Sequence, residues 1–343
     1  MLKYCCNYSL ARCLYEPNDY AIKHGNGECK LNTLSVKVKA PSSIANIGPG
    51  FDILALAVDL YYDEVKVSVD RHSSSIKLRV LGYKVPEDPN ENTAGVVARE
   101  FLEKFNIKSG LNIDILKGIK PGLGLGSSAA TAAATIVALS KLFNINLSVE
   151  EMVLLASKGE TVSAGTAHLD NVSAALLGGF TITCFDSNGN VKVFHITPPS
   201  DLKVVVAIPH VDVKPMKTSY ARNIIPKHVE LSKLILNTGR IAGIMIGILR
   251  GDSDLLSSFI CDEIIEPARS KIYTYYPYIR SALNKLGIKG VMICGAGPSI
   301  AAIPPRSMSI DSVIEAVKSE FRSLGLNADV YVAKPTDGCR IIN

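Results

Sequence analysis

The sequence predicts an α+β fold in two domains. Strand-like and helix-like segments are mixed along the chain, which is typical of a sheet covered by helices in two layers. The chain has 343 residues, of which 47% are apolar, so it can bury a large core, and this length favours two domains. A Thr-Pro-Pro-Ser segment at residues 197–200 marks the expected boundary, which gives domains at residues 34–198 and 199–343.

The first domain is expected to begin with strands, because apolar and polar residues alternate there. Thr93 caps a helix that runs to about residue 105, and an alanine-rich helix covers residues 127–143. The predicted strands around these helices lie at residues 35–40, 64–69, 76–80 and 111–116, with a loop at residues 41–52.

Capping residues indicate the helices that follow. Ser148 and Glu151 form a capping box for a helix that we expect to end near Gly159. Residues 160–177 favour a further helix, loosened at Gly165.

A hairpin is expected to close the first domain, because Asn188-Gly189 lies between two strand-like segments at residues 180–185 and 191–196. The second domain again mixes both types of element. Its predicted order is a strand at 203–208, helices within 218–250, helices at 253–273 and 278–286, strands at 290–294 and 300–303, a helix at 310–324 and a strand at 329–333.

Residues 1–33 differ from the rest of the chain. They carry four of the eight cysteines and show no periodicity, so we expect a poorly ordered accessory extension. Arg12 interrupts their apolar stretch, which argues against a secretory signal and favours a cytoplasmic protein.

Composition excludes several classes of function. The net charge of +5 is spread along the chain without a basic block, which favours a small anionic ligand over nucleic acid. The longest apolar runs are short and interrupted, so no membrane span is expected. The cysteines lack the spacing of a zinc site or a disulfide framework.

A glycine-rich loop joins the strand at residues 111–116 to the alanine-rich helix. Glycine lets backbone N–H groups turn inward, and the start of a helix adds unpaired N–H groups and the positive end of its dipole. These features favour a phosphate site, with the hydroxyls of Ser127 and Ser128 at its mouth. The alternative is a tight turn without a ligand, since glycine spacing alone is weak evidence.

Two familiar phosphate loops are excluded. A Walker A loop requires Gly-Lys-Ser/Thr, whereas Gly126 is followed by Ser127 and Ser128. A dinucleotide fingerprint requires an acidic residue at the end of a second strand, roughly 20 residues on, where this chain reads as helix.

Three glycine-bearing segments, at residues 41–52, 121–130 and 294–299, resemble the motifs of the GHMP kinase superfamily in their order and in their sequence. Residues 43–52 and the His-Leu-Asp-Asn sequence at 168–171 resemble signatures of its homoserine kinase family. The resemblance covers about residues 34–335. It implies a domain like the second domain of ribosomal protein S5, with a left-handed βαβ crossover, followed by a ferredoxin-like domain, and a homodimer.

The resemblance also implies a reaction, the transfer of the ATP γ-phosphoryl group to the side-chain hydroxyl of L-homoserine in threonine biosynthesis. Two alternatives stay open. One is another small-molecule kinase of the superfamily, such as a mevalonate-like kinase, and the other is a catalytically inactive ligand-binding member.

By resemblance, ATP is expected to contact the glycine-rich loop and one residue before the first helix. These residues are Lys117, Pro121, Gly122, Leu123, Gly124, Leu125, Gly126, Ser127, Ser128 and Asn92. Ser128 and Glu160 are expected to hold Mg²⁺, which prefers a few hard oxygens together with phosphate and water.

The expected amino-acid site has two charged ends. Asn46 and Asp52 would bind the ammonium group, and Arg222 and Arg269 the carboxylate, to which guanidinium groups bind bidentately. His168 and Asn171 would lie near the hydroxyl, and the catalytic set is Asn171, Glu160, Ser128 and Thr218.

Several of these residues also have a purely structural interpretation. Asp52 can cap a helix, Glu160 can lie on a solvated helix face, His168 can be a hydrogen-bonded structural histidine, and residues 295–299 can form a packing turn.

Asn171 cannot act as a general base, because an amide does not accept a proton as a carboxylate does. We therefore expect it to orient the hydroxyl, since phosphoryl transfer depends mainly on positioning and charge neutralisation. Asp170 is the rival base. Adjacent helical residues point about 100° apart, so we expect only Asn171 to face the hydroxyl and leave Asp170 out of the catalytic set.

Overall fold

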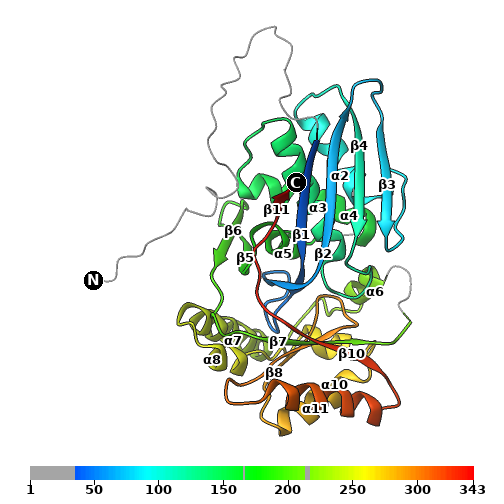
Figure 1. Cartoon of the computed structure of the whole chain (residues 1–343). Coiled ribbons are helices and arrows are strands. Elements are labelled where there is room, and N and C mark those ends of the chain that lie inside the picture. Colours follow the sequence, from blue (N-terminus) through cyan, green and yellow to red (C-terminus); the bar gives the residue numbers. More distant parts are fainter. Residues whose placement is uncertain (1–34, 165–166, 213–216) are drawn as a thin grey trace.

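The computed structural model describes residues 35–164, 167–212 and 217–343. It has two sheets, one above the other in Figure 1, with helices packed on each. The expectations for the extension at 1–33 and for the loosening at Gly165 lie outside the described residues.

The first sheet is built on two long antiparallel strands, β1 (Ser35–Ala45) and β2 (Leu54–Asp70). The prediction of a loop from residue 41 is wrong for its first part, because pairing with β2 continues to Ala45 across an irregularity between Pro41 and Ser42. The first half of β2 was also missed. It is buried from Leu54 to Val58, so it lacks the alternation that marks a half-exposed strand.

A βαβ unit completes one side of this sheet. β3 (Ile76–Gly82) and β4 (Gly110–Lys117) pair in parallel, and α2 (Thr93–Lys104) connects them. The strand order is β11-β1-β2-β4-β3. The predicted hairpin is confirmed as β5 (Phe180–Phe185) and β6 (Val191–Ile196), of which β5 pairs with the first part of β2.

Three further helices cover the sheet, namely α3 (Ser127–Leu142), α4 (Val149–Ala164) and α5 (Leu169–Leu177). The capping box is confirmed, because Ser148 N–H donates to Glu151 (3.0 Å) and Glu151 N–H donates to Ser148 Oγ (3.2 Å). Gly159 does not end α4. A Cβ there would lie 2.6 Å from Val97 Cγ2, so glycine instead lets α4 approach α2 closely.

The second sheet contains β7 (Val204–Pro209), β8 (Gly290–Ile293), β9 (Ile300–Ile303) and β10 (Ala328–Ala333). The order β10-β7-β9-β8, with every pair antiparallel, is that of the expected ferredoxin-like domain. Helices α10 (Tyr276–Lys285) and α11 (Ile310–Ser323) share its apolar core.

The helices between β7 and α10 are α6 (Lys217–Asn223), α7 (Leu231–Leu249), α8 (Ser253–Ser258) and α9 (Ile265–Arg269). The single helix predicted for residues 253–273 is wrong. Asp262 is buried and accepts hydrogen bonds from the N–H groups of Ile264, Ile265 and Glu266, so it starts a new helix.

The chain ends in the first sheet, because β11 (Arg340–Ile342) pairs with β1. The predicted boundary near residue 198 therefore separates the two sheets in sequence order but assigns this last strand to the other domain. The return of the chain also explains why residues near both ends of the described part meet at one place in Figure 1.

Candidate active site

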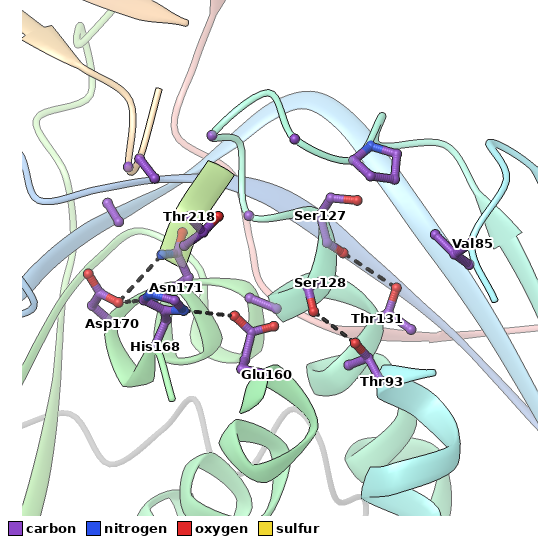
Figure 2. A pocket seen from close by; sticks show the side chains of 18 of the residues that line it. Val85, Thr93, Ser127, Ser128, Thr131, Glu160, His168, Asp170, Asn171 and Thr218 are labelled. Carbon is purple, nitrogen blue, oxygen red and sulfur yellow. Dashed lines mark hydrogen bonds and ion pairs between the residues drawn. The ribbon is translucent and has the colours of Figure 1, made fainter. Parts of the chain in front are cut away.

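A cavity of about 320 Å³ lies where the two domains meet. Its lining comes from the start of α2, the glycine-rich loop, the facing ends of α4 and α5, α6, α9 and the loop after β8. Almost all residues of the predicted site line it, and Figure 2 shows ten of the lining residues by name. The exceptions are Leu123 and Leu125, whose side chains are buried in the core.

The glycine-rich loop holds a conformation that requires glycine. Gly122, Gly124 and Gly126 have φ values of 83°, 81° and 69°. A Cβ on Gly124 would lie 2.2 Å from the carbonyl oxygen of Cys294, and one on Gly126 would lie 2.1 Å from Ser43 Oγ. Backbone is therefore exposed to the cavity here, at the start of α3, as a phosphate site needs.

The third glycine segment packs against this loop. Ser299 N–H donates to the Leu123 carbonyl (3.3 Å), and Gly124 lies against Cys294 and Gly297. Gly295 and Ala296 also border the cavity. The segment thus supports the loop and lines the site.

Lys117 borders the cavity, but its ammonium is already bound to protein groups. Its buried ammonium donates to Ser127 O (2.6 Å), to Thr131 Oγ1 (2.7 Å) and to Asp63, which uses its three donors. Asp63, which sequence reasoning missed, also accepts from Gly118 N–H and Ile119 N–H at 3.0 Å each. A buried carboxylate requires such partners, so the pair fixes the loop from below.

The two serines at the start of α3 have different positions. Ser127 borders the cavity, and its Oγ donates to the Ile119 carbonyl (2.7 Å) and so holds the loop in place. Ser128 Oγ lies 2.8 Å from Thr93 Oγ1 and lines the cavity together with Glu160 (Figure 2). A hydroxyl and a carboxylate facing one cavity are the hard oxygen donors that suit Mg²⁺.

His168 pairs with Glu160, with 3.4 Å between Nδ1 and Oε2. Burial opposes charging of the imidazole, but Glu160, Asp170 and Asp52 outweigh it and raise the pKa of His168. His168 is therefore part of an acidic cluster on this side of the cavity.

Two arginines, Arg222 and Arg269, also line the cavity. Both guanidinium groups of the pair Arg222 and Arg269 lie 5.3 Å from the ring centre of Phe51. Arg222 donates to Asp52 Oδ2 through Nη1 (2.7 Å) and Nη2 (2.6 Å), and Arg269 Nη1 donates to the Gly295 carbonyl. Asp52 and both arginines are thus brought together, as expected.

Comparison with known proteins identifies the family. The chain matches the models of the GHMP kinases N terminal domain at residues 92–179 and of the GHMP kinases C terminal region at residues 244–323. It is 41% identical to the homoserine kinase of Methanococcus vannielii, over 89% of this chain and 98% of that protein. The chain belongs to the GHMP kinase family.

Other GHMP family members agree with this placement. The homoserine kinase of Thermoplasma volcanium is 35% identical, over 90% of this chain and 97% of that protein. The crystal structure of homoserine kinase from Cytophaga hutchinsonii superposes with a TM-score of 0.81 at 32% identity, over 95% of this chain and all of that one. Mevalonate diphosphate decarboxylase from Staphylococcus aureus, at 17% identity and a TM-score of 0.67, shares the fold.

Asp170 and Asn171 both line the cavity of this GHMP protein. That only Asn171 faces the substrate hydroxyl stays a prediction. Both residues lie in the first turn of α5, whose N-terminal end points at the cavity, and there two consecutive residues can reach it. Asn171 Oδ1 accepts from Ser43 Oγ (2.9 Å), and Asp170 Oδ1 accepts from Asn171 N–H (2.8 Å). Burial, and secondly the charge of Asp52, raises the pKa of Asp170 to about 6.

Two asparagines serve the framework. Asn92, rather than Thr93, caps α2, because its Oδ1 accepts from Ala94 N–H (2.8 Å) while its Nδ2 donates to the Pro86 carbonyl (2.6 Å). Asn46 Nδ2 donates to the Gly295 carbonyl (3.0 Å), and its Oδ1 accepts from Asp52 N–H (3.3 Å). Asn46 thus joins two of the glycine segments beside the cavity.

Thr218 lies on α6 and lines the cavity (Figure 2). Among the residues that sequence reasoning missed, Ser43 and Phe51 lay inside a recognised segment but carried no chemical signal of their own. Asp63 lay in a strand that was predicted only from residue 64.

Proposed function

We propose that the chain transfers the γ-phosphoryl group of ATP to the side-chain hydroxyl of L-homoserine, giving O-phospho-L-homoserine and ADP. The observation that carries this proposal is the joining of two sites in one cavity. A loop of exposed backbone at a helix start faces the cavity, and so does a set of charged groups suited to an amino acid. The names of the similar proteins support the same reaction and its place in threonine biosynthesis.

The nucleotide end of the site uses backbone. The amides of residues 122–128 would surround the phosphates, and the positive end of α3 favours their charge. Ser128 and Glu160 would hold Mg²⁺, which supplies charge neutralisation on the phosphoryl oxygens. Lys117 contributes indirectly, by fixing the loop from below.

The acceptor end uses side chains. Asp52 would bind the ammonium group, and Arg222 and Arg269 the carboxylate, because guanidinium groups match carboxylate geometry. Asn171, held by Ser43, would position the hydroxyl between the two ends. The reaction then depends on positioning and charge rather than on proton removal by the amide.

We also infer a homodimer formed through α7. Leu231, Ile235 and Leu249 are 69%, 61% and 71% exposed, and together with neighbouring side chains they make an apolar surface. By length and composition alone, α7 could cross a membrane. Its buried glycines instead pack on Phe259 and Leu256, as in a helix of a globular domain, so a second copy is the partner we propose.

A substrate panel tests the reaction. The full-length protein with ATP and Mg²⁺ is given L-homoserine, L-threonine, L-serine, mevalonate or shikimate, and ADP release is followed by a coupled assay. The proposal requires the highest kcat/KM with L-homoserine and a phosphorylated product. Preference for another alcohol, or absence of turnover with every compound, would contradict it.

A further inference from the structure

Asp52 and Arg222 satisfy each other in this structure, although they are the groups that the proposed function offers to the two ends of an amino acid. A single oxygen, Asp52 Oδ2, accepts from both terminal nitrogens of Arg222, at 2.7 and 2.6 Å. The side chains of Arg222 and Asp52 are 27% and 39% exposed, so the pair is partly screened by solvent.

Arg269 is placed differently from Arg222. It is only 6% exposed, donates through Nη1 to the Gly295 carbonyl, and its Nε has no hydrogen-bond partner among the described residues. A buried guanidinium with a donor left over is a site for an anion. Both arginines line the same cavity beside Phe51, so an anion that enters it meets both positive charges.

Charge counting then limits what can bind. The three side chains carry two positive charges and one negative charge, and the Asp52–Arg222 pair cancels one of each. A ligand carboxylate that forms an ion pair with Arg222 takes Arg222 away from Asp52. A ligand ammonium group that forms an ion pair with Asp52 takes Asp52 away from Arg222.

We propose that the Asp52–Arg222 ion pair selects for ligands that carry an ammonium group and a carboxylate together. Such a ligand exchanges one ion pair for two. A ligand with only one of these groups must break the same pair and leaves the other side chain without its partner. This proposal rests on the proposed function only in taking this cavity as the place where the acceptor binds. It names the class of ligand that the cavity selects as α-amino acids.

A gain of affinity follows from this arrangement. If Arg222 competes with an ammonium group for Asp52, removing Arg222 should strengthen binding of an amino alcohol that lacks a carboxylate. If Asp52 competes with a carboxylate for Arg222, removing Asp52 should strengthen binding of a hydroxy acid that lacks an amine. Simple independent subsites would predict no such gain.

The test is calorimetric titration of the full-length protein, in the presence of a non-hydrolysable ATP analogue and Mg²⁺. The ligands are L-homoserine, 3-aminopropan-1-ol and 4-hydroxybutanoate. We expect Arg222→Gln to bind 3-aminopropan-1-ol about two- to fivefold more tightly than wild type does, the size of one partly exposed ion pair. Asp52→Asn should show a comparable gain for 4-hydroxybutanoate.

Arg269→Gln is the matched control, because it removes the same charge near the same ring but breaks no bond to Asp52. Its gain for 3-aminopropan-1-ol should be less than half that of Arg222→Gln. Arg222→Lys, which keeps the charge but loses the two-pronged contact, should show an intermediate gain and serves if Arg222→Gln folds poorly. Equal gains in the two glutamine variants, or no gain with either Arg222 variant, would overturn the proposal.

Turnover of L-homoserine by the wild-type preparation separates this proposal from the proposed function. If L-homoserine is phosphorylated but the variants show no gain of affinity, selection by the ion pair is overturned and the proposed function is still supported. The gain without phosphorylation supports the ion pair and contradicts the proposed function.

Discussion

The carboxylate of Asp63 and the ammonium of Lys117 form a buried ion pair beneath the glycine-rich loop. Asp63 reaches the loop from β2, and Lys117 stands at the end of β4. Between them they bond to Gly118, Ile119, Ser127 and Thr131. The conformation of the loop that faces the proposed nucleotide is therefore held by a buried ion pair that borders the cavity.

Breaking this pair should destabilise the protein. Asp63→Asn and Lys117→Met each leave a buried charge without its partner, which costs about 3–5 kcal/mol of unfolding free energy. The double variant should lose less than the sum of the two, and urea unfolding measures all three. If Lys117 acted mainly on phosphate, Lys117→Met would raise the KM for ATP and leave stability unchanged.

Gly124→Ala should weaken nucleotide binding. The new Cβ meets the carbonyls of Cys294 and Gly297, so the loop must shift, and the KM for ATP should rise at least about tenfold. Gly189→Ala is the control, because its φ of 79° is nearly the same as the 81° of Gly124 but no atom lies within 4 Å. That variant should show only the backbone cost of about 1–2 kcal/mol and an unchanged KM. Equal kinetic effects in both variants would contradict the packing argument.

Asp170 should make stability depend on pH. Its pKa of about 6 in the folded protein lies above the ordinary value of 3.8, so the folded state holds the proton more tightly than the unfolded chain. Asp170 makes its full contribution to the free energy of unfolding below pH 3.8, and this contribution is lost as pH rises through 6. Relative to wild type, Asp170→Asn should therefore gain about 2–3 kcal/mol of unfolding free energy between pH 4 and pH 8. A constant difference across this range would refute the assignment.

The neighbouring asparagine should matter more for turnover. Asn171→Ala removes the amide held by Ser43, and kcat should fall about 10- to 100-fold through lost positioning. Asp170→Asn should reduce kcat less. Near-total loss of kcat in Asp170→Asn, with the thermal unfolding midpoint unchanged, would identify Asp170 as the base and reverse the two roles.

The apolar surface of α7 should control assembly. Ile235→Asp places a charge in the exposed half of this helix, so we expect dissociation into monomers by light scattering after size exclusion. Leu81→Asp is a control at an exposed apolar residue outside α7, on β3, and should leave the assembly unchanged. If the wild-type protein is monomeric at all concentrations, the proposed homodimer is contradicted.

Local signals predicted much of the fold. The capping box of Ser148 and Glu151 and the hairpin at Asn188-Gly189 depend on residues close in sequence, and both were found as expected. Burial on both faces hid the first half of β2, and Asp262 starts α9 through contacts that no helical periodicity reveals.

Motif order brought most of the site together correctly, but it did not reveal how individual side chains are used. Lys117 reads as a phosphate ligand in sequence, yet its partner Asp63 lies 54 residues away and is brought to it by strand pairing. Asn92, expected beside the nucleotide, lines the cavity and also caps a helix, which its place in the motif did not reveal. Asp52 and Arg222 form an ion pair although they are 170 residues apart in sequence, and at that separation residue spacing does not predict a contact.

In the proposed reaction an amino acid with a hydroxyl group is held by its carboxylate at Arg269, in the same cavity as the nucleotide loop. Steady-state kinetics of Arg269→Leu, on protein whose thermal unfolding midpoint matches wild type, test it most directly. We predict that the KM for L-homoserine rises at least about tenfold, the loss of one charged hydrogen-bonded contact, while the KM for ATP changes less than about twofold. An unchanged KM for L-homoserine would contradict the account.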